Sequence, residues 1–546
     1  MALTFLSLRL AYHAVSGLSS FLHLGDCNLT NNRAKGGGAL GVSGGASVHL
    51  RGLASVMISD NRAGSGGGGG IAVDGGSVFV SQSDQLTVTR NFAAGDGGGV
   101  RASDASAVSL SGAVIERNVG GAGGGLAIVN GSVGTLDRGG SLRGNTAHRG
   151  GGAIAVSSFS KLVLSAHSIA DNAASAPGGG GVLVAANSIA LVDSVEIANN
   201  TANGGGGGGL ALVHGSTAHF ASVTFALNNV TSSSDGDGGG VLLSGSSNLT
   251  TDGNSNFWGC ACSGRGGALA LSGNSKVVVG GALNSSGCEA GGNGGALALT
   301  SSSSLSCTTL VLSGNVGGGD GGGAWVGDAA ELTVHGNDAF VFSNTASGSG
   351  GGLAVSDAIL NFVTEASQLH VMGNTAGGAG GGLHALGAAA FVQARGLVRI
   401  GANSALGGAE TAGGGGLSLG DGAVFNASST DCALHVEGNT AYGSKGGGVA
   451  LAGSSTLAIG AFSGGGIMNR GMVQFLQNRA AVDGGGLALD SGSSVQLDSG
   501  CDLTVNSNTA LRGIGGGAAH SRLTNMTLSE GNATFTNNTA ASGAGG

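Results

Sequence analysis

The sequence is short of residues on which most globular folds depend. Its 546 residues include one proline, 4% aromatic residues and 9% charged residues, against 118 glycines. So few aromatic side chains argue against a conventional mixed core, yet 41% of the residues are apolar, which is too many for a disordered chain. The remaining solution is a repeat fold, with glycine at recurring corners and aliphatic residues at recurring core positions.

Concentrated charge and long apolar runs are also missing. The net charge of −9 is spread along the chain without an acidic or basic run, so nothing favours nucleic acid or an anionic membrane as a partner. Glycine or polar residues interrupt every apolar run before it reaches roughly 18 residues, and no transmembrane helix is predicted. A short apolar run, 2–8, precedes Arg9. A secretory signal peptide has the opposite order, with its positive charge before the apolar run, so this feature argues against a signal peptide.

A tripeptide such as Asn-Thr-Ala or Asn-Arg-Ala recurs through the chain, and its first residue marks the register of the repeat. The markers are 27–32 residues apart, except for 36 before Asn439 and 39 before Asn478, so we expect longer, loop-bearing coils within 404–478. The markers predict about 18 coils in one continuous domain, 1–546, which we expect to be a fragment of a longer chain. The Asn markers are Asn32, Asn61, Asn91, Asn118, Asn145, Asn172, Asn200, Asn228, Asn315, Asn344, Asn374, Asn403, Asn439, Asn478, Asn508 and Asn538; Cys260 and Cys288 take the same place in two coils.

Apolar residues two apart precede the markers, as Val56 and Ile58 precede Asn61. This spacing is typical of a strand, because side chains two apart point to the same face. A glycine run and a second strand such as 210–212 follow the marker, and a third short strand such as 47–50 follows a turn. The sequence therefore predicts an all-β fold, a single-stranded right-handed parallel β-helix of the pectin-lyase-like kind with three strands per coil.

The two kinds of corner carry different predictions. Glycine adopts positive φ freely, which accounts for a glycine run at a sharp turn. At the marker corner a side-chain amide can donate to one neighbouring coil and accept from another, so we predict an internal asparagine ladder.

The cysteines at two marker positions leave two alternatives open. Cys260 and Cys288 should lie about one strand spacing apart, which permits either a disulfide between stacked coils or two buried thiols. Cys432 and Cys501 share another column, but they are two coils apart and should not pair with each other.

No residue pattern singles out a catalytic, cofactor or metal site. Acidic residues recur just before the glycine runs, where other coils carry Ala, Asn, Arg or Ser, and just after the second strand, where Asp suits a turn. Both patterns favour a turn role. His370, Arg399 and His435 share an outward position in three successive coils, which we interpret as a solvated basic stripe. The acidic residues are Asp96, Asp237, Asp320 and Asp483 before the glycine runs, and Asp74, Asp104, Asp328, Asp357, Asp421 and Asp490 after the second strand.

The outward column of the glycine-led strand is mostly alanine. An exposed strip of small apolar side chains could bind a neighbouring chain, a saccharide or ice. The alternative is that alanine merely fits beside crowded glycine corners. The column consists of Ala72, Arg101, Ala127, Ala155, Leu183, Ala211, Leu242, Ala270, Ala298, Trp325, Ala354, His384, Ser418, Ala450 and Ala488.

Two tetrapeptides of the repeat, [LIVF]-x-x-N and G-G-[ALVI]-x, resemble the motifs of the chlamydial polymorphic outer membrane proteins, FxxN and GGA[ILV]. The strict forms occur at 225–228, 475–478 and 535–538, and at 37–40, 151–154, 266–269 and 294–297. The resemblance covers essentially the whole chain. It implies a surface-displayed, autotransporter-like adhesin with a β-helical passenger.

We therefore expect a non-catalytic, adhesin-like protein, extracellular or on the cell surface, with a protein or saccharide ligand along its outer face and no cofactor. The alternatives are a carbohydrate-active enzyme, such as a polysaccharide lyase, hydrolase or epimerase, and an ice- or surface-binding rod. A groove with three or more converging carboxylates would favour the enzyme. A regular flat face of Ala and Thr would favour the binding rod.

Overall fold

The computed structural model describes most of the chain. The described residues are 2–542 without 6–7, 10–12, 18–19, 25, 51–54, 176–177, 232–235, 337, 365–367, 408–412, 430–432, 462–470, 499 and 522. All regular elements among them are β-strands. The sequence predicted one continuous domain; the structure groups the residues into two compact units, Met1–Gly264 with Asn274–Val277, and Arg265–Gly273 with Val278–Gly546.

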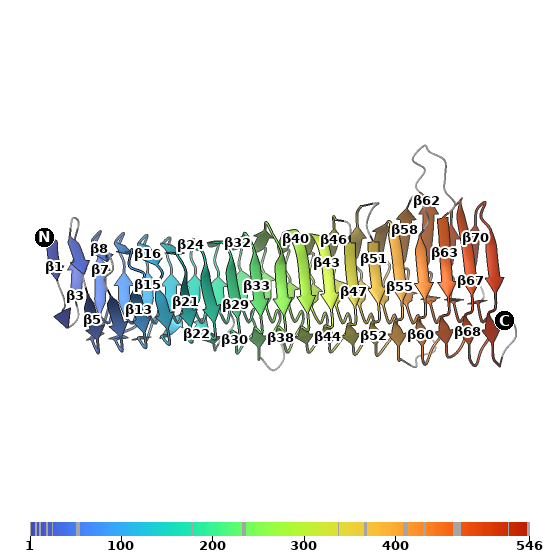
Figure 1. Cartoon of the computed structure of the whole chain (residues 1–546), viewed down its shortest axis with the longest axis horizontal. Helices are drawn as coiled ribbons and strands as arrows, with labels where there is room; N and C mark the ends of the chain where they lie inside the picture. Colours follow the sequence, from blue (N-terminus) through green and yellow to red (C-terminus); the bar gives the residue numbers. More distant parts are fainter. Residues whose placement is uncertain are drawn as a thin grey trace. The chain divides into compact units, whose positions relative to one another are not determined.

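Each unit is a parallel β-helix, as the periodicity predicted (Figure 1). A representative coil of unit 1 consists of β9 (Val56–Ser59), β10 (Arg62–Ala63), β11 (Ile71–Val73) and β12 (Val78–Ser81). These strands pair in parallel with the equivalent strands of the next coil, β13 (Leu86–Thr89), β14 (Phe92–Ala93), β15 (Val100–Ala102) and β16 (Ala107–Ser111). The short strand directly after the marker was not predicted, and in coils such as this one it adds a fourth strand. In β40 (Lys276–Ser286) and β43 (Ser304–Ser313) the third strand of one coil continues into the first strand of the next.

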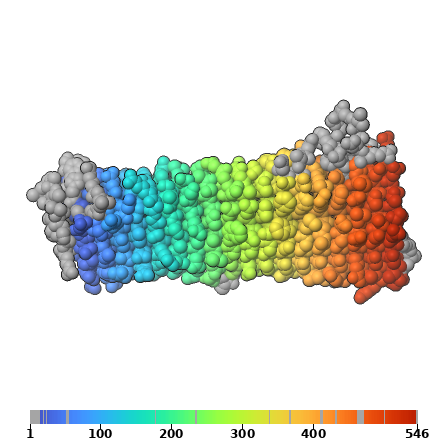
Figure 2. Space-filling model, in the orientation of Figure 1, coloured from blue at the N-terminus to red at the C-terminus, as the bar shows by residue number. Residues whose placement is uncertain are grey.

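Unit 2 repeats the arrangement. The coil of β51 (Gln368–Met372), β52 (Thr375–Ala376), β53 (Leu383–Leu386) and β54 (Phe391–Arg395) pairs in parallel with β55 (Leu397–Gly401), β56 (Ser404–Ala405), β57 (Leu417–Gly420) and β58 (Val424–Ser429). Figure 2 shows that the colours of successive coils form successive bands within each unit. The predicted insertions of 404–478 fall largely on 408–412, 430–432 and 462–470, outside the described residues.

The core is the inward column of each strand. Val56 and Ile58 are fully buried, and they lie beside Leu86 and Val88 of the next coil. Burial of one such side chain contributes about 1.5–3 kcal/mol relative to leaving it exposed. Every coil therefore packs its core against its neighbours.

The residue before each marker adopts a left-handed backbone conformation, which the sequence analysis did not predict. In Asp60, Asp171, Leu227 and Ala402 the φ angles are 59°, 58°, 53° and 53°. Glycine takes this place in several coils, including Gly373 with φ 64°. The turn thus fixes the direction from which the chain enters the marker corner.

Positive φ explains only part of the glycine run. Gly350, the first glycine of its run, has φ 68°. A Cβ on Gly351 would instead overlap the carbonyl oxygen of Gly381 in the next coil, and a Cβ on Gly352 would lie 3.1 Å from Cγ of Asn374. The second and third glycines are therefore required by close contact between coils rather than by backbone conformation.

Candidate functional site

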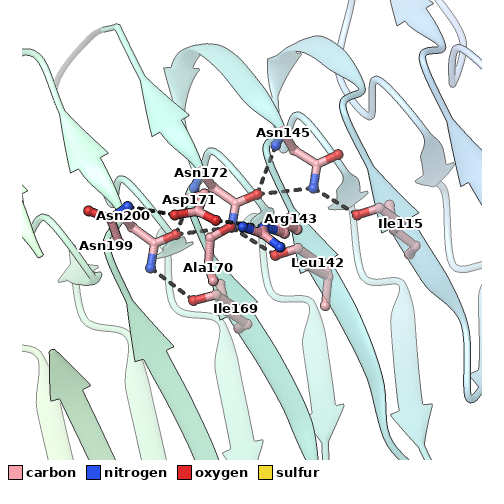
Figure 3. Close-up of polar contacts among 10 residues, drawn as sticks. All are labelled: Ile115, Leu142, Arg143, Asn145, Ile169, Ala170, Asp171, Asn172, Asn199 and Asn200. Atoms are coloured by element: carbon pink, nitrogen blue, oxygen red, sulfur yellow. Dashed lines mark hydrogen bonds and ion pairs between the residues drawn. The ribbon is translucent and has the colours of Figure 1, made fainter. Parts of the chain in front are cut away.

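The marker asparagines meet in a buried ladder (Figure 3). The backbone N–H and Nδ2 of Asn145 donate to Oδ1 of Asn172 over 2.9 and 3.0 Å. Nδ2 of Asn172 donates to Oδ1 of Asn200 over 2.9 Å and to the carbonyl of Leu142 over 2.9 Å. Each amide thus accepts from the preceding coil and donates to both neighbours, so its hydrogen-bonding capacity is used without water.

The same pattern runs through both units. In unit 1 it joins Asn32 to Asn228 through every marker between them, and in unit 2 it joins Asn315 to Asn538. The structure therefore brings together all sixteen predicted asparagines, in one ladder within each unit. This arrangement is architectural, because the side chains are buried and bonded to one another.

Cys260 and Cys288 are buried thiols in this structure, which is the second of the two alternatives that the sequence left open. Sγ of Cys260 donates to the carbonyl of Phe225 at 3.5 Å, the equivalent of the carbonyl bond made by the marker amides. Sγ of Cys288 donates to the carbonyl of Ser286 at 3.7 Å, while its backbone N–H donates to Oδ1 of Asn315. The Cys260 thiol thus makes the carbonyl bond of the marker amides, whereas the Cys288 thiol bonds to a carbonyl of the strand directly before it.

Cys501 is disulfide-bonded. The sequence analysis expected that it would not pair with Cys432, and Cys432 lies outside the described residues. Cys501 lies opposite Gly471 in the neighbouring coil, as the predicted register requires.

A second ladder, of serines, was missed. In unit 1 the backbone N–H of Ser77 donates to Oγ of Ser106, and Ser106 donates in the same way to Ser132, both over 3.2 Å. The series continues through Ser160 and Ser188, all of them buried. Its signal is a serine directly before the third strand in coil after coil, which the sequence analysis assigned only to a turn.

The alanines in the outward column of the glycine-led strand are buried, so the first of the two interpretations, an exposed alanine strip, is wrong. The larger residues of the column are half-buried: Arg101, Leu183, Leu242, Trp325 and His384. Ala211 and Ala127 have no exposed surface, and Ala354 is 3% exposed. The glycine run of the same coil passes over the column: a Cβ placed on Gly350 would lie 2.8 Å from Cβ of Ala354. Alanine is therefore selected by the contact with the glycine run, which was the second of the two interpretations.

Acidic residues before the glycine runs bond to the next coil. Oδ1 of Asp96 accepts from the backbone N–H of Ala122 over 2.8 Å, and Oδ1 of Asp483 accepts from Ile514 over 2.8 Å. Asp320 accepts in the same way from Ser349. These side chains act as turn acceptors between coils, in agreement with the turn interpretation.

The predicted basic stripe lies on adjacent strands of unit 2. Arg399 on β55 lies opposite His370 on β51 and His435 on β59 (Leu434–Glu437). His370 also stacks on Phe340 of β47 (Asp338–Phe342), with ring centroids 5.2 Å apart. Phe342 and Met372 lie beside them and are 42% and 43% exposed. We call Phe340, Phe342, His370, Met372, Arg399 and His435 the Phe342 face.

The histidines of this face have lowered pKa values. Burial is the main cause for His370, followed by the positive charge of Arg399, while Asp338 opposes the shift. For His435 the order is the same, with Glu437 opposing the shift. Both imidazoles are therefore neutral at neutral pH, and Arg399 supplies the permanent charge of the stripe.

A pocket of about 320 Å³ opens over the glycine-led strands of unit 2. Its floor is the outward column of β53, β57, β61 (Val449–Leu451) and β65 (Leu487–Leu489). We call it the His384 pocket. Its lining includes polar residues and two alanines of the floor: His384, Ser418, Asp421, Lys445, Asp490 and Ser491, with Ala450 and Ala488.

Lys445 is fixed at this pocket by two carboxylates. Its Nζ lies 3.6 Å from Oδ2 of Asp483 and 3.4 Å from Oδ2 of Asp490. A hydrogen bond from Ser521 is the main cause that lowers the pKa of Asp490, with Lys445 contributing. The sequence analysis assigned Asp483 and Asp490 to turns and did not predict that both would pair with one lysine. It also assigned Asp421, which lines the same pocket, to a turn.

In the outward column that forms the floor, His384 occupies the position that alanine holds in most other coils. Its Nδ1 is buried and has no hydrogen-bond partner. Burial, as the main cause, lowers the pKa of His384, while Asp320 and Asp421 oppose the shift. The ring is therefore neutral at neutral pH and offers an unused polar atom.

Comparison with known proteins supports the fold. Residues 78–256 match the family model of the right handed beta helix region. No curated protein and no solved structure matches the chain. The part of the chain that the structure describes has no helix long and apolar enough to span a membrane. Among the same residues, no three His, Cys, Asp or Glu side chains converge closely enough to hold a metal ion.

Proposed function

We propose that this chain is the β-helical part of a non-catalytic, adhesin-like protein, secreted or displayed on the cell surface, which binds a protein partner through the Phe342 face. The observation that carries the proposal is the exposure of Phe342 and Met372 beside Arg399. Aromatic residues, Met and Arg are the side chains enriched at protein interfaces and at their energetic centres. The resemblance to the polymorphic outer membrane proteins agrees with this function and with an extracellular location.

The β-helix also suits the proposed role physically. Parallel strands hold the Phe342 face on adjacent coils in fixed register, so a partner meets a preorganised surface. The ice-binding alternative loses its basis, because the alanines on which it depended are buried.

Binding to immobilised matrix proteins tests the proposal. The intact chain is passed over fibronectin, laminin and collagen surfaces, and the variant Phe342→Ser/Met372→Ser is compared with it. We expect saturable binding to at least one surface and at least a tenfold loss of affinity in the double variant. The matched control is Met57→Ser in unit 1, which removes a methionine that is 42% exposed, against 43% for Met372, and should leave binding unchanged. Absence of binding to all three surfaces, or equal binding by the double variant, would refute the proposal.

A carbohydrate-active enzyme is the second candidate function. The observation that favours it is that Asp421 and Asp490 line one pocket with Lys445, which also pairs with Asp483. Carboxylates in a groove are the groups that glycoside chemistry uses as acid and base. Release of reducing ends from a panel of neutral and uronate polysaccharides, abolished by Asp421→Asn, would establish this function in place of the first.

A further inference from the structure

We propose that the His384 pocket is a binding site for a neutral, hydroxyl-rich ligand of the size of a hexose unit, such as the end of a saccharide chain. The pocket lies over β53, β57, β61 and β65, whereas the Phe342 face lies on β47, β51, β55 and β59. The two sites therefore belong to different sheets. This inference does not depend on the function proposed for the Phe342 face.

The pocket lies on coils that keep the regular pattern of the glycine run. A Cβ on Gly446 would lie 2.8 Å from Cβ of Ala450, just as a Cβ on Gly350 would lie 2.8 Å from Cβ of Ala354. Beside these runs, the outward column of β57, β61 and β65 lines an accessible space of about 320 Å³. This volume falls at the lower end of the roughly 300–1,000 Å³ of small-molecule sites, and it suits one ring rather than a folded segment of chain.

His384 provides an independent indication of a ligand. The neighbouring coils place Ala354 and Ser418 at its position, so the fold does not require an imidazole there. Its Nδ1 is buried without a hydrogen-bond partner, which is a costly arrangement unless something else supplies the bond. A hydroxyl group of a bound ligand can donate to this nitrogen or accept from it, depending on the tautomer.

The charges of the pocket favour a neutral ligand. One ammonium, that of Lys445, pairs with the carboxylates of Asp483 and Asp490, and the carboxylate of Asp421 lines the same pocket. An anionic ligand would therefore be repelled. A divalent cation is also disfavoured, because Lys445 already lies between Asp483 and Asp490 and the described residues contain no metal-binding cluster.

A sugar ring matches the remaining groups. The hydroxyl groups of a hexose can donate to the exposed carboxylate of Asp421 and bond with the hydroxyls of Ser418 and Ser491. The small apolar floor, Ala450 and Ala488, can pack against the C–H face of the ring. Polar groups at the wall and apolar groups at the floor are the usual composition of a small-molecule site.

Titration of the intact chain with sugars tests the inference. Maltose, cellobiose and lactose are titrated by isothermal calorimetry and saturation-transfer NMR, with digalacturonate and calcium chloride as comparators. We expect at least one neutral disaccharide to bind with a Kd in the millimolar range or below, at least tenfold more tightly than digalacturonate. Failure of all three neutral sugars, or tighter binding of the acidic sugar or of calcium, would overturn the inference.

Two variants locate the site. Ala450→Leu fills the floor, and the chain itself accepts leucine in the same column of unit 1, at Leu183 and Leu242. We expect it to weaken sugar binding at least tenfold, and His384→Ala to weaken it at least threefold. Arg101→Ala changes the same column in unit 1 and should leave the affinity unchanged.

The variants are first compared with the parent chain by circular dichroism and thermal unfolding. If Ala450→Leu does not fold, His384→Ala decides the question, because it restores the alanine found at this position in other coils. Unchanged affinity in a folded His384→Ala chain would exclude this pocket as the binding site. Loss of sugar binding with intact attachment to matrix proteins would separate this site from the Phe342 face.

Discussion

Oδ1 of Asn374 accepts two hydrogen bonds from Asn344, one from its backbone N–H over 2.9 Å and one from Nδ2 over 3.0 Å. Nδ2 of Asn374 in turn donates to Oδ1 of Asn403 over 3.0 Å and to the carbonyl of Val341 over 2.9 Å. One fully buried side chain thus connects three consecutive coils of unit 2. Replacement of Asn374 therefore affects polar groups in both neighbouring coils.

The first prediction is that Asn374→Ala strongly destabilises the chain. The substitution removes four hydrogen bonds and leaves buried groups of Asn344 and Val341 without partners, so we expect a loss of about 3–5 kcal/mol in the free energy of unfolding. Denaturation in urea measures the loss. Asn374→Cys is the matched variant, because cysteine occupies the marker position at Cys260 and Cys288, and it should cost less than alanine. A change below about 1 kcal/mol for Asn374→Ala would show that the ladder contributes little to stability.

The second prediction concerns the left-handed residue before each marker. Ala402 has φ 53°, which is unfavourable for a residue with a Cβ, and glycine holds this place in the flanking coils as Gly373 and Gly438. We expect Ala402→Gly to raise the free energy of unfolding by about 0.5–1 kcal/mol, because relief of backbone strain exceeds the added flexibility of the unfolded chain.

The reverse substitution is the control. A Cβ on Gly373 would approach nothing closer than Oγ of Ser343 at 3.9 Å, so Gly373→Ala tests the backbone conformation without a steric clash. It should lower the free energy of unfolding by about 1 kcal/mol. Opposite signs for the two variants in urea denaturation are expected; equal signs would contradict the explanation by φ.

These residues also show how far the sequence could predict the structure. The markers and the strands before them follow from a period near 29 residues and a spacing of two, because every coil repeats the same contacts. The burial of Ala354 could not be predicted, since it depends on where the glycine run passes in three dimensions. The gathering of Asp483 and Asp490 at Lys445 was missed for the same reason: the three residues belong to different columns of the repeat.

The third prediction is a loss of stability in acid caused by His167 in unit 1. Burial, as the main cause, lowers the pKa of His167, while the carbonyl of Ser165 and the charge of Asp137 oppose the shift. Its side chain is 2% exposed, and Nδ1 donates to the Ser165 carbonyl over 2.7 Å. Because the folded state disfavours the protonated ring, the unfolded state binds the proton more readily. The stability that neutral His167 contributes to the folded state is therefore present above the pKa of histidine in the unfolded chain, about 6.5. It is lost as the pH falls below that value.

The measurement compares unfolding at pH 7.5 and pH 5.0. We expect the parent chain to be less stable at pH 5.0, and His167→Gln to show a smaller difference between the two pH values than the parent. His148→Gln, which replaces an exposed histidine of the same unit, should retain the full difference. Identical pH dependence in the parent and in His167→Gln would refute the role of this residue.

The last prediction concerns the oxidation state of the cysteines. Burial raises the pKa of the Cys307 thiol to about 12, and burial, with the charge of Asp237, raises that of Cys262 to about 12. Thiols with such values form almost no thiolate at neutral pH, and only the thiolate reacts with iodoacetamide. In the folded chain we therefore expect neither residue to be labelled. After unfolding without a reductant, peptide mapping should find Cys260, Cys262, Cys288 and Cys307 labelled and Cys501 protected. Protection of both Cys260 and Cys288 would restore the disulfide between the two marker positions, and labelling of Cys501 would show that its bond does not form.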